Sequence, residues 1–231
     1  MLRTCLTFRR EEGDPAEIAK ELCSLGAGLW THGDADQARP HLQESIAIAG
    51  EIGDDGRSAT ALSNLGVLEL HAGNAERAVE LLTRAQVFDE RVGNTWGLAV
   101  DRVNLVAATL DAGRVGDAQE DLRELAPRIA ALGDIELTIN MLELYVSVLS
   151  VLGEHRRAAR VFGAAEALRE QASMPIAPLD KEFLDRHLDR TRDMLAPDEW
   201  ESERGLGRGH DVPAAIADAA AAGSARSTPV S

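Results

Sequence analysis

The residue types that most often perform chemistry are present, but their spacing assembles no catalytic or metal-binding motif. No two of the six histidines stand four residues apart, the spacing that places two imidazoles on one helix face for a metal. Cys5 and Cys23 form no CxxC pair and read as small buried hydrophobic residues. No serine has a nucleophile-elbow pattern. The sequence therefore predicts no catalytic residue, metal site or cofactor, and we do not expect an enzyme.

The glycine-rich stretch "GLGRG" at residues 205–209 could suggest a phosphate-binding loop. It lacks the lysine and the serine or threonine that follow the glycines in such loops. We expect a flexible linker instead.

The charge of the chain argues against several classes of partner. Its 39 acidic and 24 basic residues give a formal net charge of -15, whereas nucleic acids and anionic lipids attract basic surfaces. No stretch approaches about 18 uninterrupted apolar residues, and the N-terminus has no signal-peptide pattern. We expect a cytoplasmic protein that binds no nucleic acid directly and no membrane.

Glycine followed by a polar residue recurs every forty residues in two interleaved series. The positions are Gly33, Gly73, Gly113 and Gly153, and Gly13, Gly53, Gly93 and Gly133. The spans between them are rich in helix formers, with apolar residues at helical spacing. Because glycine followed by Asp or Asn is typical of a helix end and the next N-cap, each forty-residue unit is predicted to be a helical hairpin.

Gly66 stands inside one of these predicted helices, where glycine costs about 1 kcal/mol relative to alanine. Gly26 has the same register, and alanines recur in the second helix of each hairpin, as at Ala78. Small residues let two helix axes approach closely. We interpret Gly66 as a packing residue: leucine there should overpack the hairpin by about 1–3 kcal/mol, and alanine should be tolerated.

The pattern of one hairpin resembles the tetratricopeptide repeat. The matching residues are Leu62, Leu65, Gly66, Ala78, Leu82 and Ala85. The third unit departs from the pattern at Arg102 and Val106, and Leu29 and Glu69 replace the usual aromatic residue three positions after the glycine. The resemblance implies an all-α fold: a right-handed superhelical α-solenoid of about four hairpins with C-terminal capping helices.

The forty-residue period and residues 160–218 further resemble the C-terminal region of actinobacterial ATP-binding transcriptional regulators of the LuxR type. Residues 1–13 are predicted to be the second helix of an incomplete repeat and residues 14–173 four hairpins. Residues 174–212 are predicted to form capping helices and a linker, and residues 213–231 a short helix and a disordered tail. Apolar surface at the incomplete N-terminal end predicts self-association through that end.

The resemblance also implies that the first helix of each hairpin lines a concave face. The candidate binding residues on that face are Trp30, Asn64, Val67, Leu70, His71, Val103, Asn104, Leu110, Asn140 and Glu143. Asn64 and Asn104 share one register, where an amide could bridge to the backbone of an extended peptide, with Trp30 as an anchor. The alternative is that the apolar members pack against neighbouring helices. Val100 and Asn104 replace the cations of a carboxylate clamp, so an acidic chaperone tail is not an expected ligand.

Two functions remain open. The first is a non-catalytic protein–protein interaction scaffold, the sensor or oligomerisation region of a transcriptional regulator, with a protein or peptide partner. The second is a receptor that binds a short peptide or a small apolar ligand in the concave groove. A defined small ligand would raise the melting temperature of a receptor, whereas a scaffold would co-purify with a protein.

Overall fold

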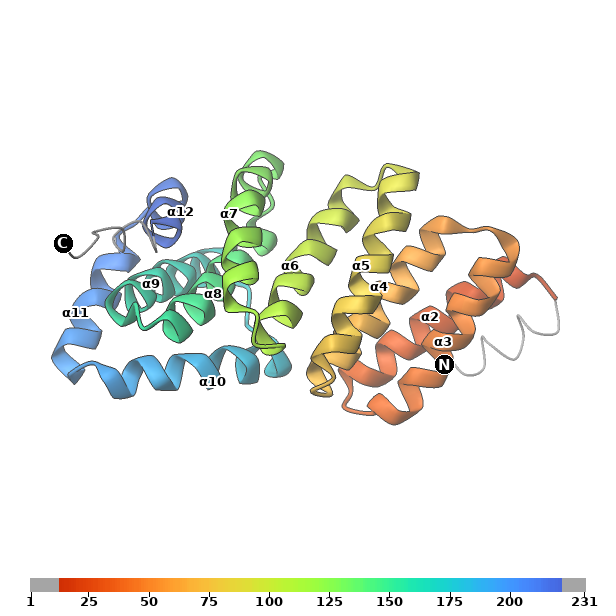
Figure 1. Cartoon of the computed structure of the whole chain (residues 1–231), viewed down its shortest axis with the longest axis horizontal. Helices are drawn as coiled ribbons and strands as arrows, with labels where there is room; N and C mark the ends of the chain where they lie inside the picture. The colour runs from red at the N-terminus through yellow and green to blue at the C-terminus, as the bar shows by residue number, and fades with distance from the viewer. Residues whose placement is uncertain (1–12, 222–231) are drawn as a thin grey trace, which may run out of the picture. The chain divides into compact units, whose positions relative to one another are not determined.

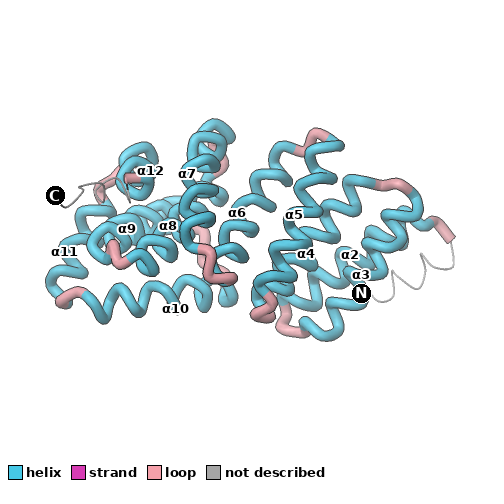
Figure 2. Tube along the Cα trace, viewed as in Figure 1, coloured by secondary structure: helices cyan, strands magenta, loops and turns pink. Residues whose placement is uncertain are grey.

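The structure is a computed structural model that describes residues 13–221, and within that range every regular element is an α-helix (Figure 2). The expected all-α fold is confirmed. The chain divides into two compact units, residues 1–112 and residues 113–231. The helix predicted over residues 1–13, apart from Gly13, and the tail predicted after residue 221 lie outside the described residues.

The described part of the first unit consists of two helical hairpins followed by one further helix (Figure 1). Its helices are α2 (Pro15–Thr31), α3 (Ala35–Ile52), α4 (Asp55–His71), α5 (Ala75–Val92) and α6 (Thr95–Asp111). Helices adjacent in sequence pack against each other from α2 to α6. Each element therefore covers the apolar face of its neighbour, as repeat architectures require.

The turns of this unit have the glycines that the sequence pattern marked. Their φ angles lie between 69° and 88° at Gly33, Gly53, Gly73 and Gly93. Residues with a Cβ pay about 1–2 kcal/mol for this left-handed conformation. After two of the turns a side chain caps the next helix: Asp54 accepts a hydrogen bond from the Arg57 amide at 2.9 Å, and Asn94 accepts one from the Gly97 amide at 3.1 Å. The pattern of helix end followed by N-cap is confirmed at both.

Gly66 lies at a close contact between α4 and α5. A Cβ at Gly66 would lie 2.7 Å from Cγ of Leu82, and one at Gly26 would lie 2.6 Å from Cγ of Leu42. The interpretation of Gly66 as a packing residue is confirmed. The close contact argues against the expectation that alanine is tolerated there, because Leu82 is fully buried and would have to move to admit the methyl group.

The second unit contains one helix before the fourth hairpin, the fourth hairpin itself and the helices that follow it. Its helices are α7 (Val115–Leu132), α8 (Ile135–Leu152), α9 (His155–Ala172), α10 (Pro178–Met194), α11 (Pro197–Arg208) and α12 (Val212–Ala220). By length and composition α8 could cross a membrane, although Glu136 and Glu143 interrupt its apolar run. Because 67% of that segment is buried inside the structure, α8 is a core helix of this unit.

α9 and α11 cross with their backbones in contact. A Cβ at Gly163 would lie 2.1 Å from the carbonyl oxygen of Arg204, and one at Gly207 would lie 1.8 Å from that of Arg160. Only glycine leaves room for this approach. The expectation of a flexible linker at residues 205–209 is wrong. Residues 205–208 lie in α11, and Gly209 is the C-cap of that helix. Gly207 is needed at the helix crossing because it has no Cβ.

The arginines of this crossing also form ion pairs across it. Arg160 donates to Glu203 at 2.5 Å, and Arg204 donates to both carboxylate oxygens of Glu166 at 2.8 and 2.9 Å. Arg160 makes a further hydrogen bond, at 2.9 Å, to Asp218 of α12. The Arg-x-x-Gly segments of α9 and α11 therefore make a reciprocal, antiparallel contact that holds the cap on the fourth hairpin.

α10 packs along α8 (Figure 1) and is joined to it by a chain of hydroxyl groups. Thr191 donates to Ser150 at 2.7 Å, and Ser150 donates to the Val146 carbonyl at 2.7 Å. Nδ1 of His155 lies 3.3 Å from the Thr191 hydroxyl. The chain connects α8, the first turn of α9 and α10.

Candidate interaction surface

Of the ten candidate binding residues, eight lie in the first unit and two in the second. In the first unit the rings of Trp30 on α2 and His71 on α4 stack at a centroid distance of 5.6 Å and an interplanar angle of 20°. Both side chains are half-buried, and the Trp30 indole N–H has no hydrogen-bond partner. This aromatic pair joins the two helices while keeping part of each ring accessible.

Asn64 is already engaged by the protein. Its amide donates to the Cys23 sulfur at 3.3 Å, from α4 to α2. Burial raises the pKa of the Cys23 thiol, while the Asn64 hydrogen bond acts in the opposite direction, so Cys23 is a poor nucleophile at neutral pH. A peptide could use only the remaining hydrogen-bonding capacity of Asn64.

The other candidates in this unit differ in how much surface they offer. Leu70, Val103 and Leu110 are each about 5% exposed. Val67 and Asn104 are half-buried. The three nearly buried side chains can add little contact area to a partner, and their burial favours the packing alternative for these positions.

Asn140 and Glu143 of α8 form a polar cluster with α9 in the second unit. Arg169 donates to the two carboxylate oxygens of Glu143 at 2.6 and 2.7 Å and to the Asn140 side-chain oxygen at 3.3 Å. Burial raises the pKa of Glu143, against the effect of the Arg169 hydrogen bonds. Both candidate residues are thus committed to a contact within the unit.

Glu69, which replaces the usual aromatic residue, forms a polar centre that motif reasoning missed. It is 6% exposed and accepts hydrogen bonds from Arg39 at 2.6 and 3.3 Å and from Asn74 at 2.6 Å. Burial alone would raise the pKa of Glu69, but the Arg39 and Asn74 hydrogen bonds outweigh it and hold the pKa below its ordinary value. The glutamate at position 69, where the repeat pattern has an aromatic residue, was the sequence signal that could have indicated this polar centre.

Asp101 on α6 is a second buried acid that sequence reasoning did not single out. It is 1% exposed, and its Oδ2 has no hydrogen-bond partner. Burial raises its pKa to about 7, a hydrogen bond from Ser63 lowers it, and the nearby Asp89 raises it. Within residues 13–221 no group of three or more His, Cys, Asp or Glu side chains could hold a metal ion, so we assign these acids no metal.

Three features of this unit belong to one kind of helical repeat. They are the stacked helix pairs, the glycine at the close helix contact and the buried alanine at position 78. Residues 17–86 match the tetratricopeptide repeat model. This tetratricopeptide match begins in α2 and ends in α5. It therefore contains the Trp30–His71 stack and the Glu69–Arg39 pair.

One curated protein is similar to part of the chain. The regulatory protein RapG of Bacillus subtilis (strain 168) is 31% identical over 84 residues, which are 36% of this chain. The matched region covers 23% of the length of RapG.

Proposed function

We propose that this chain is a non-catalytic protein-interaction module and forms part of a cytoplasmic transcriptional regulator. The observation that carries the proposal is the tetratricopeptide match over residues 17–86, because such repeats generally mediate binding of protein partners. The partial similarity to a protein named as regulatory supports a regulatory setting.

We further propose that the partner contacts a small patch on α2 and α4, the α2–α4 patch, consisting of Trp30, Asn64, Val67 and His71. On α4 the last three stand at i, i+3 and i+7, so they share one helix face. All four side chains are half-buried, unlike Leu70 on the same helix. An aromatic anchor beside an aliphatic residue and an amide is a combination common in protein interfaces.

The test is site-specific photo-crosslinking from position 67. A photoreactive phenylalanine analogue replaces Val67 in one protein and Val87, which is 44% exposed on α5, in a control protein. We expect a protein cross-linked from position 67 and not from position 87. Binding of the purified partner should then weaken at least about tenfold in Val67→Glu, a loss of about 1.4 kcal/mol. Equal cross-linking from both positions, or unchanged binding by Val67→Glu, would contradict the α2–α4 patch.

Self-association through the N-terminal end remains a separate prediction. Sedimentation velocity at increasing protein concentration measures it directly. A monomer at every concentration across the micromolar range would contradict it.

A further inference from the structure

Two buried acids on α5 and α6 occupy positions that are apolar in the neighbouring repeats. Asp89 and Asp101 are 4% and 1% exposed. In the helix pairs forty residues before and after, the same register positions hold Ala49 and Ala61, and Ile129 and Met141, all 0% exposed. The repeat therefore packs without charge at these positions. The two acids are a special feature of the contact between α5 and α6.

The two carboxylates lie close together along one face of α6. A Cβ at Gly97 would lie 2.4 Å from Oδ2 of Asp89, so the Asp89 carboxylate rests against the first turn of α6. Gly97 and Asp101 stand four residues apart on that helix, which places them about 6 Å apart on the same face. The charge of Asp89 accordingly acts on Asp101.

The surroundings of this pair supply hydrogen bonds but no positive charge. Nδ2 of Asn94 donates to Oδ1 of Asp89 at 2.9 Å, and Ser63 of α4 donates to Asp101. Oδ2 of Asp101 has no hydrogen-bond partner. Among the described residues, Asp89 is the charged group that faces Asp101 from α5, and α4 contributes the neutral Ser63 hydroxyl. A buried carboxylate in these surroundings favours its protonated form.

We propose that Asp89 and Asp101 form a pH-sensitive switch that holds α6 against α4 and α5. With a proton on Asp101, the pair carries one negative charge fewer and α6 stays packed. Without that proton, two like charges are buried together, and α6 opens more often because opening hydrates both carboxylates. α6 is the last helix of the first unit, where it packs against α5 and α4. The switch does not depend on the proposed scaffold function.

The size of the effect depends on how tightly Asp101 holds its proton in each state. In the packed helix the pKa of Asp101 is about 7, against an ordinary value of 3.8 that an opened helix would restore. Opening therefore releases a proton between these two pH values. Raising the pH from 5 to 7 should increase the opening of α6 about tenfold or more.

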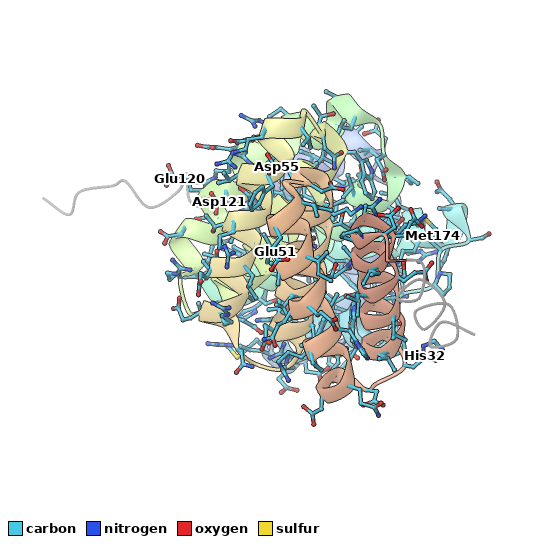
Figure 3. All side chains as sticks on the ribbon, turned by 90° about the vertical axis from the view of Figure 1, so that its right-hand side faces the viewer. His32, Glu51, Asp55, Glu120, Asp121 and Met174 are labelled. Atoms are coloured by element: carbon cyan, nitrogen blue, oxygen red, sulfur yellow. The ribbon has the colours of Figure 1, made fainter. Side chains whose placement is uncertain are left out.

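Hydrogen exchange of the α6 amides in the full chain, expressed as protection factors at pH 5 and pH 7, measures this opening. We expect protection to fall about tenfold or more in the wild type and less than about twofold in Asp101→Asn. Asp89→Asn should give an intermediate fall, because it removes the like charge but keeps Asp101. The matched control is Glu51→Gln, which removes an exposed acid of α3 that Figure 3 labels.

Urea distinguishes opening of α6 alone from unfolding of the whole unit, because the urea dependence of exchange scales with the surface exposed. We expect exchange in α6 to depend less on urea than exchange in α4. Equal protection and equal urea dependence in the two helices would overturn the switch. It would also be overturned by a fall in Asp101→Asn as large as in the wild type, or by a Glu51→Gln profile as flat as that of Asp101→Asn. A wild-type protection factor that does not change between pH 5 and pH 7 would overturn it without any variant.

Discussion

The pH dependence of stability should depend strongly on Asp101. Its side chain is 1% exposed, and burial, opposed by the Ser63 hydrogen bond and reinforced by Asp89, raises its pKa from 3.8 to about 7. The folded protein therefore holds this proton more tightly than the unfolded chain does. The resulting stabilisation is fully present below about pH 4 and is lost as the pH rises through about 7.

Asp101→Asn replaces the titrating acid with a neutral group of nearly the same shape. A difference of about 3 pKa units at about 1.36 kcal/mol each sets an upper limit of about 4 kcal/mol at pH 8. We expect the variant to resemble the wild type near pH 4, to gain relative stability between about pH 4 and pH 7, and to be more stable at pH 8 by up to that amount. Asp89 is present in both proteins, and its charge acts on Asp101, so the difference between the two reports the titration of Asp101 together with this coupling.

Urea unfolding followed by circular dichroism at pH 5, 6, 7 and 8 measures this difference. Asp36→Asn is the control, because the Asp36 side chain is fully exposed. Its unfolding free energy is measured at the same four pH values. A constant offset between Asp101→Asn and the wild type at all four pH values would refute the reasoning.

Three further experiments, each on one or two substitutions, test the packing described above. Gly207→Ala should detach α11 from α9, because the added Cβ would lie 1.8 Å from the Arg160 carbonyl oxygen. Gly205→Ala is the control, because no atom lies within 4 Å of the Cβ it adds, and it should stabilise α11 by about 1 kcal/mol. Hydrogen exchange of α11 separates the two, and equal exchange would argue against the close crossing. Gly66→Ala should cost about 1–3 kcal/mol in urea unfolding, and a neutral result would show that the facing leucine can move aside. Arg39→Met should lower the free energy of unfolding by about 2–3 kcal/mol, because it leaves the buried Glu69 carboxylate without its guanidinium partner. Adding Glu69→Gln to the same chain should recover part of that loss. If the double variant is no more stable than Arg39→Met, the ion pair does not explain the loss.

Much of the helical architecture could be predicted because each turn carries its own local signal. Gly53 and Gly93 need no information from distant residues to adopt the left-handed conformation, and the following Asp54 and Asn94 cap the next helix locally. Gly207 shows where local reasoning fails. Whether a glycine marks a loop or a close helix contact depends on the facing helix, here on a residue more than forty positions away.

The candidate surface was predictable only as a set of positions on one helix face. The repeat register places Trp30 and Val67, but it does not state how closely the neighbouring helix approaches, so the burial of Leu70 was not visible. The partner of Glu69 lies thirty residues earlier and is defined by hairpin packing. An open groove between α9 and α10 lies after the last forty-residue unit, so no periodicity could predict it.

The reciprocal contact between Arg160-x-x-Gly163 and Arg204-x-x-Gly207 makes the cap sensitive to length as well as to composition. Inserting or deleting one residue within either segment would rotate the part of the helix that follows by about 100°. The two glycine contacts and the two arginine ion pairs could then no longer form at the same time. A point change such as Glu203→Gln removes one ion pair of this contact, whereas inserting or deleting one residue at the centre of α11 disrupts the glycine contacts and the ion pairs together.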